Sequence, residues 1–549
     1  MVDRLRRRLL AGSGVLAAAG LSGCAAPSGG GRAPASATSG DLKLLFYADT
    51  QAQWLPVRAH PAATHLGPLN LLGQAPYFTE QARLDKLGVA ADSRQARWLT
   101  TSAARRQPQW MGGYAQLAQA LYQERSQWGA QACLTLEGGQ CWSGSGLAQM
   151  TQGRYGPVSS HWLGADMRLA SRERNLWPAQ VDALYREFGR PVLTSEQPVQ
   201  RLIRADVRIA VIGVPEVWAQ RRATDEAWNP GQWLESLQRQ INQERTRNDL
   251  LLLVSANGTN PDLWLARQLR GVDLILSSGG QDLWPRLVTD APVPVCLSGS
   301  QGQGYFSLVA HKTGQGWQFE GAFNPVYSEQ TEPLAPVAEQ LTRLRAPFAS
   351  WLDLPLAEAP AWLYRRDVLA GSWDEVMSQA LRATGASLTL MPGLRQGVAL
   401  APGDVITREH LLSLTAGHEA PVFDLPVTRE SLKSRLEVGA DQLLSEDWFL
   451  HTSEDMPRLG GAHYVLRYQA IAGQRVGELS WPGEQSSSPQ RLMGWSPYYQ
   501  GEGRPLWQLL EAWLREQPTH WRIPQVERPS LAFVDGHPGW HPAALELGA

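Results

Sequence analysis

The sequence predicts an α/β protein of two domains, on three observations. From Leu42 onward, apolar runs of strand length end in polar or glycine-rich loops and alternate with helical patterns, as in layered α/β sheets. A chain of 549 residues is too long for one ordinary hydrophobic core. A helical stretch with several prolines, residues 331–358, separates two groups of these elements.

The first domain is predicted to span residues 41–330. Its strands are expected in five apolar runs, at 42–49, 132–139, 207–214, 249–258 and 272–280. The helical patterns between them lie at 112–129 and 230–247, and a strand pair around 294–322 closes the domain. Because parallel strands joined by helices end at one edge of a sheet, we expect the polar loops to gather at that edge.

A linker helix and a second domain are predicted to follow. The linker covers 331–358 and is expected to be broken by its prolines, which are Pro333, Pro336 and Pro347. The second domain, 359–549, begins with a helix and then a strand within 361–391, and it has another helix within 402–414. The candidate turn or N-cap residues of that helix are Asp404 and Thr407.

The N-terminus has the pattern of an export signal. A basic start precedes an apolar stretch that is too short to span a bilayer, and small residues precede Cys24. The run LSGC resembles a bacterial lipobox, in which Cys24 becomes the lipidated first residue, and RRRLL loosely resembles a twin-arginine signal. We predict a lipoprotein signal peptide over 1–23, a flexible tether over 24–40, and a periplasmic protein anchored to the membrane by lipid on Cys24. Ala25 favours the outer membrane.

Charge and cysteine content narrow the classes of partner and of redox chemistry. The net charge is −2 and no basic patch stands out, so a nucleic-acid partner is not expected. Besides Cys24, the chain has Cys133, Cys141 and Cys296. An odd number in an oxidising compartment predicts at least one unpaired thiol.

Loop motifs along nearly the whole mature chain carry a family resemblance. The motifs of the first domain are ADTQAQWLPV, the insertion HLGPLNLLGQAPYFTEQARLDKLGV, MGGYAQLAQAL, LEGGQCWSGSG, LGADMRLASRERN, VSANG and VDLILSSGGQD. Those of the second domain are LYRRDVLAGSWDEVMSQAL, MPGLRQG, PGDVITREHLLSLT and DMPRLGG. They resemble the periplasmic thiosulfohydrolase (SoxB-like) branch of the 5′-nucleotidase and metallophosphoesterase superfamily. The resemblance implies a four-layer metallophosphoesterase-like sandwich domain followed by a 5′-nucleotidase-type C-terminal α/β domain.

The resemblance also implies a site for two divalent metals, Mn or Zn, and here the chain departs from its family. Such a site needs many carboxylate or imidazole ligands converging from different loops. Of the seven ligand positions, one keeps a residue of ligand type, Asp49. The others hold Gln51, Gln140, Ser171, Ala256, Gly279 and Gln281. Beside them the chain keeps Glu173, Asn257 and Asp282. We therefore predict that no metal cofactor is bound, and that the glutamine amides satisfy one another and Asp49.

Two other uses of these loops stay open. A hydrolase of S-sulfo or phosphate esters with an atypical metal site could use Asp49, Glu173 and Asp282 with a nearby histidine, the candidates being His65 and His161. A thiol-dependent sulfur handler could use Cys141, which takes the place of the family's threonine, if its pKa is lowered. Cys296, at the end of a strand near the same sheet edge, is a further thiol to consider.

The resemblance implies that a ligand enters between the two domains. In the family, that ligand is a sulfonate on a cysteine of a carrier protein's flexible arm. Arg395 in MPGLRQG matches the family's arginine and is predicted to bind a sulfonate, with Arg458 as a second candidate and Arg365 and Arg366 as further ones. We predict a pseudoenzyme of periplasmic thiosulfate oxidation that binds a Sox-type sulfur carrier protein or its sulfonated arm.

Overall fold

The computed structural model describes residues 41–217, 229–448, 455–483, 489–532 and 536–540. The predicted signal peptide, the tether and Cys24 lie outside the described residues. Residues 39–549 form one unit by their contacts. None of the described helices combines the length and the apolar character needed to cross a membrane.

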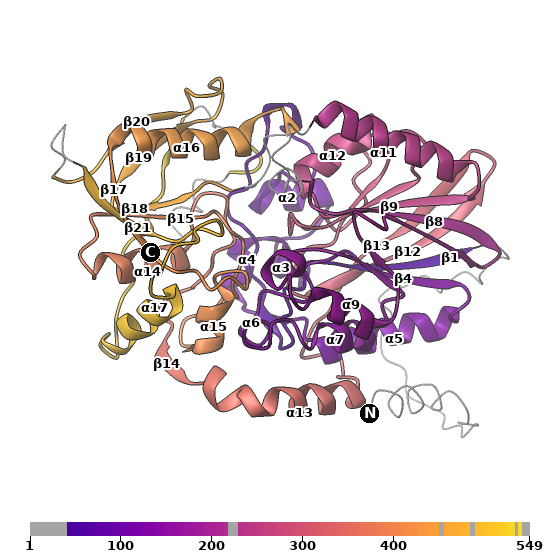
Figure 1. Ribbon diagram of the computed structural model, residues 1–549, viewed down its shortest axis with the longest axis horizontal. Helices are drawn as coiled ribbons and strands as arrows, with labels where there is room; N and C mark the ends of the chain where they lie inside the picture. Colours follow the sequence, from indigo (N-terminus) through magenta and orange to yellow (C-terminus); the bar gives the residue numbers. More distant parts are fainter. Residues whose placement is uncertain (1–40, 218–228, 449–454, 484–488, 533–535, 541–549) are drawn as a thin grey trace. The chain divides into compact units, whose positions relative to one another are not determined.

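The first lobe contains two β-sheets (Figure 1). The six-stranded sheet has the order β13-β12-β1-β4-β5-β6, with β13 Gly316–Pro325, β12 Gly304–Thr313, β1 Leu42–Tyr47, β4 Cys133–Glu137, β5 Met167–Leu169 and β6 Val192–Leu193. The five-stranded sheet has the order β11-β10-β9-β8-β7, with β11 Val295–Leu297, β10 Leu274–Ser277, β9 Leu250–Ser255, β8 Val207–Val214 and β7 Val199–Arg204. Each of the five predicted apolar runs contains a strand, whereas β5, β6 and β7 were not predicted.

The alternation of side chains along β1 shows how these sheets are layered. Leu44 and Phe46 belong to the core cluster that also contains Leu252 of the other sheet, so the two sheets pack face to face. Leu45 and Tyr47 point the opposite way, into a cluster with the helix α5 (Tyr114–Trp128). The outer helices are α7 Gly156–Trp162 and α9 Val181–Phe188 on this side, and α11 Pro230–Arg245 and α12 Thr259–Gln268 on the other. The four-layer α/β sandwich is therefore confirmed.

The parallel strands bring the candidate loops to one edge of the sheets. β1, β4 and β5 run parallel in one sheet, and β8, β9 and β10 run parallel in the other. Their carboxyl ends lead into loops 48–54, 138–145, 170–172, 256–258 and 278–282. The expected gathering of polar loops is thus present.

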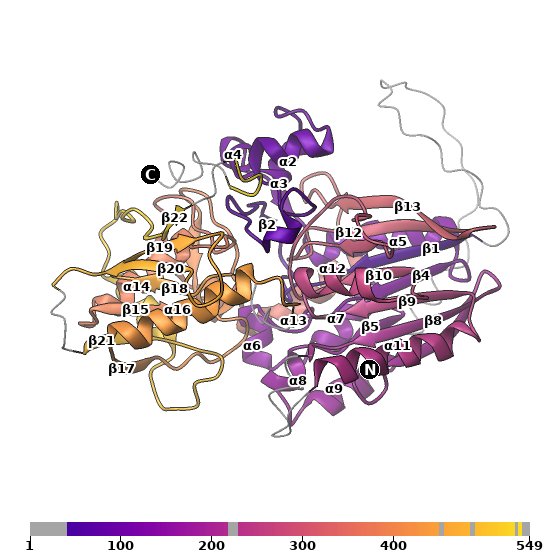
Figure 2. The ribbon, with the colours of Figure 1, turned by 90° about the horizontal axis from the view of Figure 1, so that it is seen from above.

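A segment inserted into the first lobe contacts the second lobe, where Arg58 binds Asp404 and the Thr64 N–H donates to Asp367. The insertion after β1 consists of small elements, which are β2 Val57–Arg58, η1 Leu69–Leu71, α2 Glu80–Leu87, α3 Ala96–Leu99, α4 Thr101–Arg106 and β3 Trp110–Met111 (Figure 2).

The predicted break of the linker helix is wrong: α13 runs unbroken over Ala335–Leu352 with Pro347 inside it. Pro336 lies in its first turn, where no N–H partner is needed. Packing of Val337, Leu341 and Leu352 offsets the hydrogen bond that Pro347 cannot make.

The second lobe contains a four-stranded sheet with the order β17-β21-β15-β18 and a three-stranded sheet with the order β20-β19-β22. Their strands are β17 Phe423–Val427, β21 Gln490–Gly494, β15 Leu388–Met391, β18 Arg458–Gly460, β20 Val476–Ser480, β19 His463–Arg467 and β22 Ser530–Ala532. Its helices are α14 Ser372–Arg382, α15 Arg408–Ser413, α16 Arg429–Leu444 and α17 Leu506–Arg515, and β14 Pro355–Glu358 pairs with β16 Val405–Thr407. As predicted, α14 precedes a strand and Thr407 is the N-cap of α15.

Candidate functional site

The loops at the sheet edge hold several site residues in an uncommon backbone conformation. Asp49, Gln51, Gln140 and Gln281 have φ angles of 49°, 54°, 51° and 59°. Such left-handed conformations cost a non-glycine residue of the order of 1 kcal/mol or more, and they persist where the surroundings fix them, often at functional sites. Here the first two loops are joined by backbone hydrogen bonds, from Asp49 N–H to the Gly139 carbonyl at 3.0 Å and from Gln51 N–H to the Gln140 carbonyl at 2.9 Å.

Asp49 is bound by the backbone of the last loop. Its carboxylate accepts the N–H of Gly279 at 2.8 and 3.0 Å and the N–H of Gln281 at 3.3 Å. Burial raises the pKa of Asp49 to about 7, against the opposing effects of these N–H groups and of Arg172. The carboxylate of Asp49, which stands at a predicted ligand position, therefore binds the backbone of the loop 278–282.

The glutamines are only partly satisfied in the way the sequence predicts. Gln51 Nε2 donates to Gln281 Oε1 at 2.6 Å, so these two amides pair as expected. Asp49 is satisfied by backbone N–H groups, and not by glutamine side chains. Gln140 Oε1 and Gln51 Oε1 are buried and have no hydrogen-bond partner among the described residues. The predicted pairing is therefore right for one pair and wrong for Asp49 and Gln140.

Ser171 and Glu173 belong to a buried charge network below the loops. Arg168 bridges two carboxylates, with Nε 2.8 Å from Glu137 Oε1 and Nη1 2.7 Å from Glu173 Oε1, and all three side chains are 0% exposed. Ser171 Oγ donates to Glu173 Oε2 at 2.7 Å and accepts the Gln140 N–H at the same distance. Although burial acts against the charged carboxylate, Arg168 lowers the pKa of Glu173. The pair anchors the loop that carries Gln140.

Asp282 is held in an ion-pair network between the lobes. Arg395 Nη1 lies 2.5 Å from Asp282 Oδ1, and Arg395 Nε lies 2.8 Å from Asp455 Oδ1. His65 Nε2 is 3.3 Å from Asp282, and the Thr259 hydroxyl donates to its other oxygen at 2.6 Å. Burial works against ionisation, but Arg395 and His65 hold the pKa of Asp282 well below its usual range.

The remaining ligand positions offer no ligand side chain. Ala256 is buried, and the amide of Asn257 accepts the Val217 N–H at 2.9 Å and donates to Ser255 Oγ at 2.9 Å. Gly279 has a φ of 89°, and a Cβ there would lie 2.6 Å from the Ala256 carbonyl oxygen. A side chain at position 279 therefore requires this loop to change its path.

These residues do not fit a dinuclear metal site. Two divalent ions need several carboxylate or imidazole ligands, and neutral amides are poor substitutes for them. Glu173 and Asp282, the carboxylates available to an alternative site, are both engaged by arginines. Within the described ranges, no three His, Cys, Asp or Glu side chains are grouped so as to hold a metal ion.

The thiols are buried and unpaired. Cys133, Cys141 and Cys296 are all free. Cys141 Sγ donates to the Gly139 carbonyl at 3.1 Å, and burial followed by the nearby Glu137 raises its pKa well above the usual range. The thiol hypothesis required the opposite shift, and the pKa of Cys296 is raised in the same way by burial.

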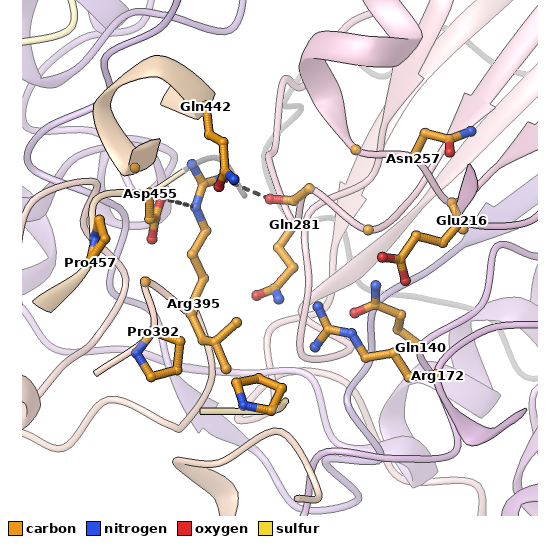
Figure 3. A pocket seen from close by; sticks show the side chains of 18 of the residues that line it. Gln140, Arg172, Glu216, Asn257, Gln281, Pro392, Arg395, Gln442, Asp455 and Pro457 are labelled. Atoms are coloured by element: carbon orange, nitrogen blue, oxygen red, sulfur yellow. Dashed lines mark hydrogen bonds and ion pairs between the residues drawn. The ribbon is translucent and has the colours of Figure 1, made fainter. Parts of the chain in front are cut away.

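A cavity of about 270 Å³ opens beside the loops and is lined by both lobes (Figure 3). Its walls include Gln140, Arg172, Gln281, Arg395 and Asp455, and prolines and glycines of the second lobe complete it. Figure 3 shows Gln140 and Gln281 pointing into the space, with Arg172 next to Gln140. The cavity is thus polar at its first-lobe wall.

Of the four arginines that the sequence offers as ligand contacts, Arg395 lines this cavity, and Arg365, Arg366 and Arg458 do not. Arg395 lines it, but its guanidinium is shared with Asp282 and Asp455. Arg458 is 2% exposed, does not line the cavity, and donates to the Asp367 and Val368 carbonyls at 2.5 and 2.8 Å. Its position gives no support to the predicted ligand contact, because its donors serve the interior of the second lobe.

The other two arginines also have protein partners. Arg365 is buried and paired with Asp374 at 2.8 Å. Arg366 donates to the Ser300 hydroxyl at 3.1 Å and to the Gln281 carbonyl, which ties the second lobe to the last loop. Neither belongs to the cavity lining. His161, on α7, lies 5.3 Å from Phe188 by ring centroids, among the outer helices.

Sequence reasoning missed Arg172. It lies between Ser171 and Glu173 and lines the cavity. Its carbonyl accepts the N–H groups of Asn175 and Leu176, but its guanidinium has no hydrogen bond or ion pair with any residue that the structure describes. Its charge acts on nearby groups: it opposes the rise that burial causes in the pKa of Asp49, and it adds to the lowering that burial causes in the pKa of His418. The available signal was an arginine directly after a ligand position at a loop tip, where a buried strand has just ended.

Comparison with solved structures identifies the fold. No family model and no curated protein matches the sequence. Among solved structures, the sulfate thiohydrolase SoxB of Thermus thermophilus is 24% identical, with a TM-score of 0.82 over 91% of this chain and 98% of that chain. A 5′-nucleotidase precursor, also from Thermus thermophilus, is 15% identical, with a TM-score of 0.70 over 90% and 99%. A 5′-nucleotidase from Candida albicans is 11% identical, with a TM-score of 0.53 over 88% and 99%. The chain therefore has the two-domain α/β fold of SoxB and the 5′-nucleotidases.

Proposed function

We propose that this chain is an exported binding protein of periplasmic sulfur-compound oxidation, a metal-free counterpart of a SoxB-like hydrolase that has the fold and lacks the ligands. Its target is a Sox-type sulfur carrier protein, engaged through a sulfonated cysteine arm. One observation carries the proposal: the ligand positions hold Asp49 on backbone N–H groups, a Gln51–Gln281 amide pair, and residues without ligand side chains.

The cavity supports binding of an anionic group. Arg172 lines it, and its guanidinium has no partner among the described residues. Charge-assisted bonds from a guanidinium to sulfonate oxygens are strong and directional. Gln140 and Gln281 add amide groups on the same wall. Lipid anchoring through Cys24 and periplasmic location belong to the same proposal, and the names of the structural neighbours are consistent with an exported protein.

The two alternative functions have less support. A hydrolase of S-sulfo or phosphate esters with an atypical metal site needs Glu173 or Asp282 as ligands, and both are ion-paired with arginines. Sulfur transfer through Cys141 needs a reactive thiolate, whereas burial raises the pKa of that thiol.

Metal content tests the first part of the proposal. The protein is incubated with excess Mn²⁺ and Zn²⁺, dialysed, and analysed by mass spectrometry. The control variant combines Gln51→His, Gln140→Asp, Ala256→His and Gln281→His, and leaves Gly279 unchanged because its φ of 89° disfavours a side chain. We expect negligible metal in the native protein. Two ions per native chain would overturn the proposal and make the hydrolase assay the next step.

Binding of a sulfonated thiol tests the second part. The probe is a short peptide that carries S-sulfocysteine, and affinity is measured by isothermal titration calorimetry. We expect Arg172→Gln to weaken binding by about tenfold or more, since a hydrogen bond to a charged group contributes about 1.5–3 kcal/mol. The matched control is Arg174→Gln, which removes a surface arginine paired with Glu196 at 2.9 Å. Equal affinity of the two variants would refute the assignment of Arg172.

A further inference from the structure

A second cavity, of about 310 Å³, lies between the lobes and shares no lining residue with the first. The first lobe lines it with residues 52–57, Trp110, Ser145 and Leu147, and α13 contributes Arg345. The second lobe contributes 398–400, Asp404, Val405 and the start of α15. Its volume falls in the range of small-molecule sites, which favour the junction of two structural units. Nothing in the proposed function uses this cavity.

The walls of this second cavity are largely apolar. Trp54, Val57, Leu147, Val398 and Leu400 line it and are all less than a tenth exposed. Two further lining residues, Leu55 and Val405, are exposed hydrophobics at 45% and 47%. A ligand with an apolar body would therefore replace solvent along most of the wall.

The charged groups at the wall nearly cancel. Asp404 is bound by the Arg58 guanidinium through two bonds, at 3.1 and 2.9 Å. Arg345 is bound to Asp353 through two bonds, at 2.5 and 2.6 Å. Arg345 also lies 4.0 Å from Glu409, so its single positive charge is shared by two carboxylates and one negative charge is in excess.

Glu409 is the carboxylate that Arg345 approaches less closely, since the two short bonds of Arg345 go to Asp353. Its Oε1 accepts the N–H groups of Gly146 and Leu147 at 2.8 and 3.4 Å. Its Oε2 is buried and has no hydrogen-bond partner among the described residues, and the Arg345 guanidinium is 4.0 Å away. A buried acceptor without a partner is costly, so this oxygen favours a donor from a ligand.

Two neighbouring side chains shape the polar end. His410 Nδ1 accepts the Thr407 N–H at 3.1 Å, and burial lowers the pKa of this imidazole to about 4, so it carries no charge near neutral pH. Gln53 is 6% exposed and lines the cavity, and its Nε2 has no hydrogen-bond partner in the described part of the chain. The cavity therefore offers one free acceptor, with excess negative charge, and one free donor.

We propose that this second cavity binds a small organic ammonium ion with an aromatic or branched aliphatic body and one hydroxyl or carbonyl group. The ammonium group pairs with Glu409 Oε2, the body packs on Trp54, Leu147 and Val398, and the hydroxyl or carbonyl oxygen accepts from Gln53. Anionic ligands are disfavoured because the lining cation, Arg345, is already paired with Asp353.

The test compares two ligands of the same shape and opposite charge, tyramine and 3-(4-hydroxyphenyl)propionate, by titration calorimetry on the purified protein. We expect tyramine to bind with a Kd of about 1 mM or below and the propionate to bind at least about tenfold more weakly. Glu409→Gln keeps the Oε1 acceptor that caps Gly146, and it is expected to weaken tyramine binding at least about tenfold. Glu358→Gln, which removes an exposed charge on β14 outside the cavity, is expected to change nothing.

A second variant guards against loss of folding in the first. Val405→Trp acts at an exposed lining position and is expected to block tyramine without disturbing the core. Absence of tyramine binding at about 10 mM, equal binding of the propionate, or full tyramine affinity in both Glu409→Gln and Val405→Trp would each overturn the proposal.

Discussion

Glu173→Gln tests whether the buried carboxylate beside the site is a structural charge or a metal ligand. In the structure, its carboxylate accepts from Arg168 at 2.7 Å, from the Ser171 N–H and hydroxyl at 3.0 and 2.7 Å, and from the Tyr185 hydroxyl at 3.0 Å. Every one of these partners is a donor. A glutamine amide replaces one oxygen by a donor that faces them, and it leaves Arg168 with Glu137 alone.

The expected cost follows from burial. Arg168 and Glu173 have side chains that are 0% exposed, and breaking a buried pair by neutralising one partner destabilises a protein by about 3–5 kcal/mol. The matched control is Glu196→Gln, because the Arg174–Glu196 pair has the same chemistry but side chains that are 35% and 65% exposed. Exposed pairs contribute about 0–1 kcal/mol. We therefore expect a difference of about 2–5 kcal/mol between the two variants.

Urea unfolding followed by circular dichroism measures this difference in the free energy of unfolding, taken from the first transition. Metal content is measured on the same preparations. If Glu173→Gln were no more destabilising than Glu196→Gln, the buried network would not have the role assigned to it. A metal-loaded native protein whose metal is lost in Glu173→Gln would show instead that Glu173 is a ligand.

Three further predictions concern residues of the first lobe. Burial, opposed by the Ser255 hydroxyl, raises the pKa of Asp262 to about 7, so the folded chain keeps a proton that the unfolded chain loses above about pH 4. Stability should therefore fall by up to about 4 kcal/mol from pH 4 to 7, and Asp262→Asn should flatten this part of the pH profile of unfolding. Cys141 should resist alkylation by iodoacetamide at pH 8 in the folded protein and react after denaturation, as measured by mass spectrometry; modification in the native state would revive the thiol alternative. Gly279→Ala should lower the free energy of unfolding by about 1–3 kcal/mol because its Cβ meets the Ala256 carbonyl at a φ of 89°, and an unchanged value would show that the loop rearranges freely.

Local patterns in the sequence were sufficient for the α/β class and for the main strands, whereas the four-layer arrangement followed from the family resemblance. Apolar runs such as 207–214 and 249–258 became buried parallel strands, since a strand covered on both faces needs nearly continuous apolar residues. The same reasoning failed at Pro347, where packing of α13 against its neighbours outweighed a local signal for a break. The motifs also located every loop of the site, because parallel strands deliver their carboxyl ends to one edge.

For the site, the sequence by itself therefore determined which side chain stands at each predicted ligand position. It showed that one position keeps a carboxylate and that the others hold amides or small residues. Which of those groups remain available was decided by the tertiary structure. Arg395 and Arg172 are both loop arginines in the sequence. The guanidinium of Arg395 is shared by Asp282 and Asp455, whereas that of Arg172 has no partner among the described residues. The physical reason is that the charge state and hydrogen-bonding capacity of a side chain depend on partners brought from distant segments, such as Asp455 for Arg395, and on burial, as for Cys141 and Asp49.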